Sequence, residues 1–225
     1  KKIKSSAFAS CTSLKTVSIP SNVTEIAGYA FQNCESLANF SLPTALKTIG
    51  GFAFYGCSSL TAITIPKSVE KIDYQQAFQK CVSLTKITVE SGNTVYDSRD
   101  NCNAIVETAT NKLVQACKTS TIPSSIEAIG QNAFYWMEWT SVTIPASVKS
   151  IEEYAFNSSF YTSEAPKEII CEVETLFEIN SNVFYDEDYK VATLYVPESS
   201  IEAYRNTPAW SQFQNIKAIG GRSEE

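Results

Sequence analysis

Hydrophobic positions recur along the chain with a period of about 23 residues. Ala-Phe pairs mark this period, because they begin at residues 7, 30, 53 and 77 and are 23, 23 and 24 residues apart. One frame of residue types follows each pair, which in the first copy consists of Cys11, Ser13, Leu14, Val17, Ile19, Pro20, Val23 and Ile26. Eight positions of the frame match in three successive copies, which predicts a protein built from structural repeats.

Each copy contains one short segment in which inward-facing apolar residues are regularly spaced. In the first copy, Leu14, Val17 and Ile19 have the spacing of a strand with one apolar side, and Pro20 ends it because proline has no N–H for the ladder. A repeat this short cannot bury its apolar side alone and must stack on its neighbours. We therefore expect a leucine-rich-repeat solenoid of the α/β type, with one strand per repeat in mainly one parallel sheet on the concave side.

The aromatic residue of each Ala-Phe pair is the predicted centre of the core. We expect a single right-handed arc of about eight strands with these rings stacked inside it. The rings are those of Phe8, Phe31, Phe54, Phe78, Phe134 and Phe156. Burial of each ring would contribute roughly 1.5 to 3 kcal/mol to stability.

The frame is interrupted between Val89 and Ile122. Two apolar runs, 104–106 and 113–114, flank a polar turn, which predicts a β-hairpin inserted at about residues 95–118. Its structural interpretation is an elongated coil that widens the sheet, and its functional interpretation is a binding loop.

The frame degrades again after Phe156, which indicates that a cap follows. Residues 168–173 and 194–197 are predicted strands, and Ser199 or Ser200 is the expected N-cap of a helix that carries Ile201 and Tyr204. Trp210, Phe213 and Ile216 are spaced by three, which favours a second helical turn. We expect one domain over residues 1–219, with a short helical C-terminal cap at about 191–219 and a tail at 220–225.

The frame resembles the BspA-like, or Treponema-type, leucine-rich repeats of bacterial surface proteins, whose consensus is close to AFxxCxSLxxIxIPxxVxxIG. The resemblance covers nearly the whole chain. It implies an extracellular or cell-surface protein of a host-associated bacterium, with an adhesin-like role in binding a host or bacterial surface protein. Because Lys1 already lies inside a repeat, we expect the native N-terminus to precede it.

Composition argues against catalysis and several partner classes. The chain has no His and only eight Gly, none in a phosphate-loop pattern, so we expect no enzyme activity and no cofactor. The net charge is −6 with scattered cations, which argues against nucleic-acid binding, and no apolar run is long enough to span a membrane. Carboxylates at 97–100, 152–153 and 186–188 are interpreted as solvated turns, so no metal site is expected.

The seven cysteines are predicted to be mostly structural. Cys11, Cys34, Cys57 and Cys81 share one repeat position, which predicts a buried ladder of free thiols. Cys171 replaces a strand-core residue. Cys102 and Cys117 can face each other in the predicted hairpin, and two alternatives remain there: a disulfide, or an inward-facing free Cys117.

The candidate ligand surface lies where the repeat carries unusual outward residues. Hydroxyl side chains form two rows on the outward side of the predicted strands, and among them we select Thr119, Thr121, Ser141 and Thr143. Trp136 occupies a surface turn beside Tyr135, whereas Met137 and Trp139 take core positions. Trp136 either packs over a neighbouring coil or anchors a ligand. The function expected first is protein binding; the alternatives are a carbohydrate-binding module and a structural spacer.

Overall fold

The structure is a computed structural model that describes residues 1–73, 77–137, 139–157 and 167–221. It contains two compact units, and each of them is a stack of coils. The first unit comprises Lys1–Ala109 with Val114–Ser120, and the second comprises Thr110–Leu113 with Thr121–Glu225.

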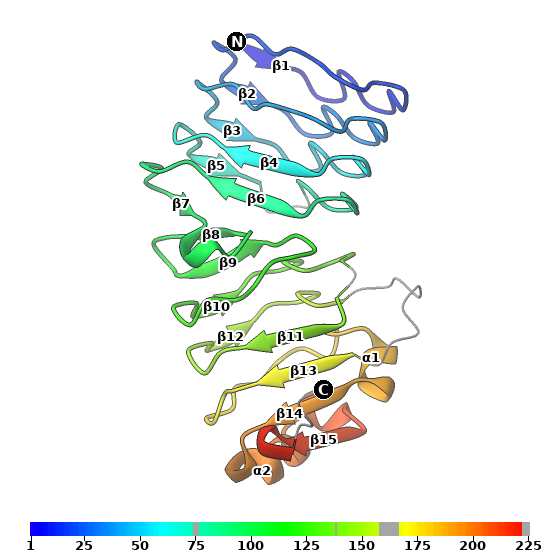
Figure 1. The fold of residues 1–225 in the computed structure, drawn as a ribbon, viewed down its shortest axis with the longest axis vertical. Helices are drawn as coiled ribbons and strands as arrows, with labels where there is room; N and C mark the ends of the chain where they lie inside the picture. The colour runs from blue at the N-terminus through cyan, green and yellow to red at the C-terminus, as the bar shows by residue number, and fades with distance from the viewer. Residues whose placement is uncertain (74–76, 138, 158–166, 222–225) are drawn as a thin grey trace. The chain divides into compact units, whose positions relative to one another are not determined.

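In the first unit, equivalent residues of successive repeats pair in parallel. Ile3, Ile26, Ile49 and Ile72 are Cα partners in one four-stranded sheet, so one turn of the solenoid equals one sequence repeat. Figure 1 shows these strands as successive rungs (blue to cyan). They are β1 (Lys2–Ile3), β2 (Glu25–Ile26), β3 (Thr48–Ile49) and β5 (Lys71–Ile72). The predicted leucine-rich-repeat solenoid is confirmed.

The structure differs from the expected single strand per repeat. The predicted strand lies before the proline, where β4 (Ala62–Ile65) pairs in parallel with β6 (Lys86–Val89), and β2, β3 and β5 form a second line after the proline. Along β4, Ile63 and Ile65 are buried, and Ala62 and Thr64, which alternate with them, are exposed. The extra line arises because the residues after the proline turn are also extended and meet their equivalents in the next coil. Where the proline is present the turn is closed by a hydrogen bond, for example from the Val69 N–H to Pro66 O at 3.1 Å.

The phenylalanine ladder forms the core of both units. In the first unit the rings of Phe8, Phe31, Phe54 and Phe78 stack at centroid separations of 5.0, 5.4 and 5.3 Å. In the second unit Phe134, Phe156 and Phe184 stack in the same way. All of these rings are buried except Phe8, which is half-buried in the first coil. The predicted ring stack is confirmed, and Phe184 extends it.

Three of the four cysteines in the predicted ladder are buried. Their thiols also form hydrogen bonds, which the apolar packing role predicted for them did not include. Cys34, Cys57 and Cys81 each donate their S–H to the carbonyl of the phenylalanine one coil earlier, at 3.1 to 3.2 Å. Burial raises the pKa of the Cys34 thiol to about 11 and that of Cys57 to about 12. Cys11, at the same repeat position in the first coil, is exposed, so the predicted burial is wrong for this one member of the ladder.

We therefore expect the ladder thiols to be unreactive in the folded protein. At pH 8 only a trace of Cys34 or Cys57 would be thiolate, which is the form that attacks a disulfide reagent. Titration with a chromogenic disulfide under native conditions should modify Cys11 rapidly and spare both ladder thiols, which should react only after unfolding. Rapid native modification of Cys57, located by mass spectrometry, would contradict this burial.

The insertion forms the predicted hairpin and one further strand. β8 (Ile105–Glu107) and β9 (Lys112–Gln115) are neighbours in one sheet, and β7 (Tyr96–Asp97) pairs antiparallel with β8. Cys102 and Cys117 are free. The Cys117 S–H donates to Asn103 O at 3.2 Å, so the disulfide alternative is wrong and the inward free thiol is correct.

The second unit contains one continuous parallel sheet. Ser141, Glu168, Thr193 and Asn215 are successive Cα partners across it. Its strands are β11 (Ser141–Ile144), β13 (Glu168–Cys171), β14 (Thr193–Val196) and β15 (Asn215–Ala218), shown from green to red in Figure 1. Two short strands, β10 (Ala128–Ile129) and β12 (Ser150–Ile151), pair in parallel elsewhere in the unit.

The C-terminal cap is only partly helical. α2 (Ile201–Asn206) is the predicted helix, but no side chain caps it, because the Ser200 hydroxyl donates instead to Glu174 O at 3.2 Å. The second expected helical turn is a 3₁₀ turn over Trp210–Gln212, and its expected extension to Ile216 is wrong, because Ile216 lies in β15. A helix not expected from the sequence, α1 (Asp186–Val191), precedes β14. Two further 3₁₀ turns span Glu198–Ser200 and Ile219–Gly221.

Candidate functional site

The acidic clusters are only partly the solvated turns that the sequence predicts, because Asp186, Glu187 and Asp188 begin the helix α1 and Asp188 is buried. The Asp97 carboxylate binds the Arg99 guanidinium at 2.7 Å, and Asp188 is buried against Lys167. Within the described ranges, no three His, Cys, Asp or Glu side chains are grouped to hold a metal ion. No helix in these same ranges is long and apolar enough to cross a membrane.

The hydroxyl residues of the predicted surface are exposed but do not form one group. Ser141 and Thr143 share the outward side of β11, with Val142 and Ile144 turned inward. Thr121 is exposed and lies outside the strands. Thr119 belongs to the first unit, where its hydroxyl donates to Thr85 O. The structure therefore brings together only Ser141 and Thr143 among these four.

The predicted aromatic pair is part of a larger cluster. The rings of Tyr135 and Trp136 meet edge to face, with centroids 5.7 Å apart and planes at 88°. Tyr154, from the next coil, lies 6.2 Å from Tyr135 and is 38% exposed. Tyr135 and Trp136 are half-buried. We name Tyr135, Trp136 and Tyr154 the aromatic turn cluster.

Backbone conformation gives this cluster an unusual feature. Each regular coil has two residues with positive φ: one directly before the Ala-Phe pair and one two residues after it. Non-aromatic residues fill many of these positions, namely Ser6, Ser10, Asn33, Gly56, Lys80 and Asn132. Trp136 (φ 61°) and Tyr154 (φ 59°) occupy them in the second unit. A bulky residue is rare in this region, where the Cβ atom approaches the backbone closely.

The first unit has an aromatic group at the same repeat positions. Tyr29 (φ 62°, 41% exposed) and Phe52 (φ 57°) stack at 5.0 Å with nearly parallel planes. Phe52 also contacts Tyr55 at 5.7 Å, and the Lys80 ammonium lies 5.3 Å from the Tyr55 ring centre. Sequence reasoning missed this group and Tyr154. Their shared repeat positions, directly before or after the Ala-Phe pair, were the available signal.

Met137 and Trp139, the two residues predicted to fill the core after Trp136, differ in burial. Trp139 is buried as predicted, and the Lys167 ammonium lies 4.5 Å from its ring centre. Its indole N–H has no hydrogen-bond acceptor among the described residues. Met137 is half-buried, so it lies at the border of the core and not within it.

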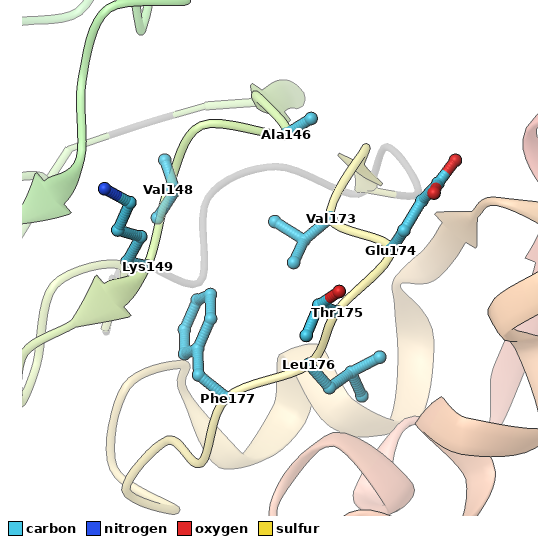
Figure 2. A pocket seen from close by; sticks show the side chains of 8 residues that line it. All are labelled: Ala146, Val148, Lys149, Val173, Glu174, Thr175, Leu176 and Phe177. Atoms are coloured by element: carbon cyan, nitrogen blue, oxygen red, sulfur yellow. The ribbon is translucent and has the colours of Figure 1, made fainter.

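A cavity of about 460 Å³ opens in the second unit (Figure 2). Val148 and Val173 are its buried residues, and Leu176 and Phe177 are half-buried. The exposed rim is formed by Ala146, Lys149, Glu174 and Thr175. No sequence pattern directly predicts this cavity, although it lies where the Ile-Pro end of the frame is lost.

Comparison with known structures supports the fold. A leucine-rich repeat protein from Eubacterium ventriosum matches 97% of this chain at 23% identity with a TM-score of 0.62. The chain spans about half of that protein, because the match covers 52% of it. A leucine-rich cell surface protein from Faecalibacterium prausnitzii matches 99% of this chain and 70% of its own, at 24% identity and a TM-score of 0.55. No curated protein shows significant similarity to the chain.

The repeat family is identified by sequence. The model of the BspA type leucine rich repeat region matches in six copies, over residues 1–106 and 100–217. The matches extend across both units and include the insertion and most of the cap. This chain therefore belongs to the family of BspA-type leucine-rich repeat proteins.

Proposed function

We propose that the chain is a non-catalytic protein-binding module of the bacterial cell surface, and that the aromatic turn cluster is part of its contact surface. The observation that carries the proposal is the placement of Trp136 in a left-handed position that Ser10, Asn33, Gly56 and Lys80 fill in other coils. Backbone strain of this kind costs on the order of 1 to 3 kcal/mol and concentrates at functional sites.

The chemistry of the cluster favours a protein partner. Tyr and Trp are enriched at protein interfaces because they bury a large apolar area and lose little side-chain entropy. The neighbouring outward residues of β11, Ser141 and Thr143, are exposed hydroxyls that can form the polar rim of such an interface. The cell-surface location rests on the family and on the resemblance of the repeats to adhesin-like proteins.

The proposal is tested with an array of host extracellular-matrix proteins, bacterial surface proteins and glycans. We expect the folded chain to bind at least one protein on the array. Binding restricted to glycans would replace the proposal with a carbohydrate-binding module. A chain that binds nothing on the array would favour a spacer.

The substitution Trp136→Asn separates binding from folding. Trp136 has a positive φ, which Asn tolerates, so the substitution should relieve backbone strain while it removes the ring. The melting temperature should therefore change little. Affinity for the array partner should fall by about thirtyfold or more, as expected for an anchor worth about 2 kcal/mol. Asn132→Ser is the matched control at the other left-handed position of the same coil. Equal affinity of Trp136→Asn and wild type would remove Trp136 from the contact surface.

A further inference from the structure

The backbone ladder of the second unit is interrupted beside the cavity. In the preceding coil pair it is regular, because the N–H groups of Lys149 and Glu152 donate to Glu127 O (2.8 Å) and Ile129 O (2.9 Å). In the next coil the Glu172 N–H still donates to Ile144 O at 2.9 Å, but the residues that follow Glu172 leave the ladder. Among the described residues, no backbone hydrogen bond joins 145–155 to 173–182. The ladder resumes where Phe156 N–H donates to Val183 O at 2.9 Å.

The sequence explains the departure. A regular coil has Ile-Pro followed by Val at the third position, and this turn brings the next residues back into the ladder, as the Val148 N–H to Pro145 O bond shows. The coil that begins with β13 has no proline there and continues through Glu172, Val173 and Glu174. It therefore forms no second short strand, and β12 is the end strand of its sheet.

The corresponding end strand of the first unit, β5, belongs to a coil whose free edge is covered by side chains of the insertion. The backbone N–H of Ile72, in β5, donates to the Tyr96 hydroxyl at 3.0 Å. The Asn93 amide donates to Pro66 O (3.1 Å) and Val69 O (2.9 Å) in the same coil. No side chain of the described residues covers β12 in this way. An unprotected strand edge is a template for pairing with another extended chain.

The cavity lies directly before β12 in the chain and offers an apolar contact. Lys149, on its rim, is followed by Ser150, the first residue of β12, and Figure 2 shows Val148, Val173 and Phe177 around the opening. Phe177 is anchored to the cap, because its carbonyl accepts the Trp210 indole N–H at 3.0 Å and the two rings meet edge to face. The cavity wall is thus held in place without a ligand.

The charge of the second unit indicates which partner fits. Its residues include seven Lys and Arg against sixteen Asp and Glu, a net charge of −9, whereas the first unit has eleven against eight, a net charge of +3. On the cavity rim the Lys149 ammonium pairs with Glu127 at 2.5 Å, so Glu174 is the acidic group that remains exposed at the opening.

We propose that β12 and the adjacent cavity bind an extended, basic segment of a partner protein. The segment adds as a strand to β12, one apolar side chain enters the cavity, and a neighbouring Lys or Arg pairs with Glu174. Main-chain hydrogen bonds supply affinity in this mode, and the pocket for alternate side chains supplies selectivity. This inference rests on the proposed role in protein binding. It adds a second contact surface, at β12 and the adjacent cavity, and specifies that the bound segment is extended and basic.

The test uses four synthetic peptides and the whole chain. Each peptide has seven residues in which Lys alternates with one apolar type, either Val, Leu, Ile or Phe, and carries a fluorescent label for anisotropy titration. We expect at least one to bind with a Kd below about 1 mM. N-methylation of alternate peptide bonds should weaken that binding at least about tenfold, and so should replacement of Lys by Glu.

Matched variants locate the binding. Ala146→Trp should block the cavity opening and weaken the best peptide at least about tenfold, whereas Thr44→Trp, the exposed equivalent after the regular Leu42-Pro43 turn, should not. Glu174→Gln should weaken binding about threefold at low salt, and the control Asp186→Asn should leave it unchanged. Failure of all four peptides, or equal binding to Ala146→Trp, would overturn this site. The proposed protein-binding function would still stand if an array partner were lost on Trp136→Asn.

Discussion

Replacement of Phe54 by Ala should lower the free energy of unfolding by about 3 to 5 kcal/mol. The ring is fully buried, lies between Phe31 and Phe78 at 5.4 and 5.3 Å, and meets Phe40 edge to face at 4.9 Å. Its removal leaves a cavity that neighbours on a stacked ladder cannot fill without breaking their own contacts. Urea unfolding followed by circular dichroism measures the loss.

The control for this substitution is Phe52→Asn. Phe52 is half-buried and has φ of 57°, so loss of its stacking on Tyr29 is offset by relief of the left-handed backbone. We expect a change of less than about 1 kcal/mol. A loss below 1 kcal/mol for Phe54→Ala would contradict the stacked core. All three tryptophans lie in the second unit, so tryptophan fluorescence separates effects there from effects on the first.

Lys167→Met should destabilise the second unit by about 3 to 5 kcal/mol at neutral pH, because it leaves a buried carboxylate without its counter-ion. The Lys167 ammonium lies 2.7 Å from the Asp188 carboxylate, and their side chains are only 12% and 3% exposed. Met keeps an apolar side chain beside Trp139, so the change acts mainly on the charge. Urea unfolding followed by tryptophan fluorescence reports it, and the double variant Lys167→Met/Asp188→Asn should recover much of the loss.

The loss should depend on pH in a defined direction. Burial raises the pKa of Asp188 in the folded protein, and the Lys167 hydrogen bond and charge partly oppose this shift. Without Lys167 the folded-state pKa rises further above the unfolded value. The folded variant then binds a proton more readily than the unfolded chain, so its stability is highest below the unfolded pKa and is lost as pH rises through the folded one. The deficit relative to wild type should shrink from pH 7.5 to pH 5, and a constant deficit would contradict a buried charge.

The sequence predicts the repeat frame well because each frame residue has one fixed role in every coil. The ring at Phe31, the thiol at Cys34 and the turn at Pro43 recur 23 residues later, so stacking and register follow from the repeat alone. The hairpin was predictable for a similar reason, since a polar turn separates two apolar runs. The second line of short strands was missed, because only one apolar residue, such as Ile49, marks each of its two-residue strands.

The cap and the candidate surfaces depend on contacts that no local pattern specifies. Ile216 has helical spacing from Trp210 but joins β15, because β14 offers it a parallel partner. Tyr154 contacts Tyr135 only because successive coils stack. The edge of β12 is open because the next coil forms no second short strand that could pair with it. Periodicity describes regular repeats, whereas both proposed contact surfaces lie at departures from it.

Hydrogen–deuterium exchange of the chain with and without its array partner tests the proposed function most directly. If the aromatic turn cluster is part of the contact surface, bound partner should slow amide exchange in the segments around 132–137 and 152–156. If the open edge is also used, the segment around 146–151 should be slowed as well. Protection confined to β11 and β13, with exchange at both turn segments unchanged, would contradict binding through the aromatic turn cluster.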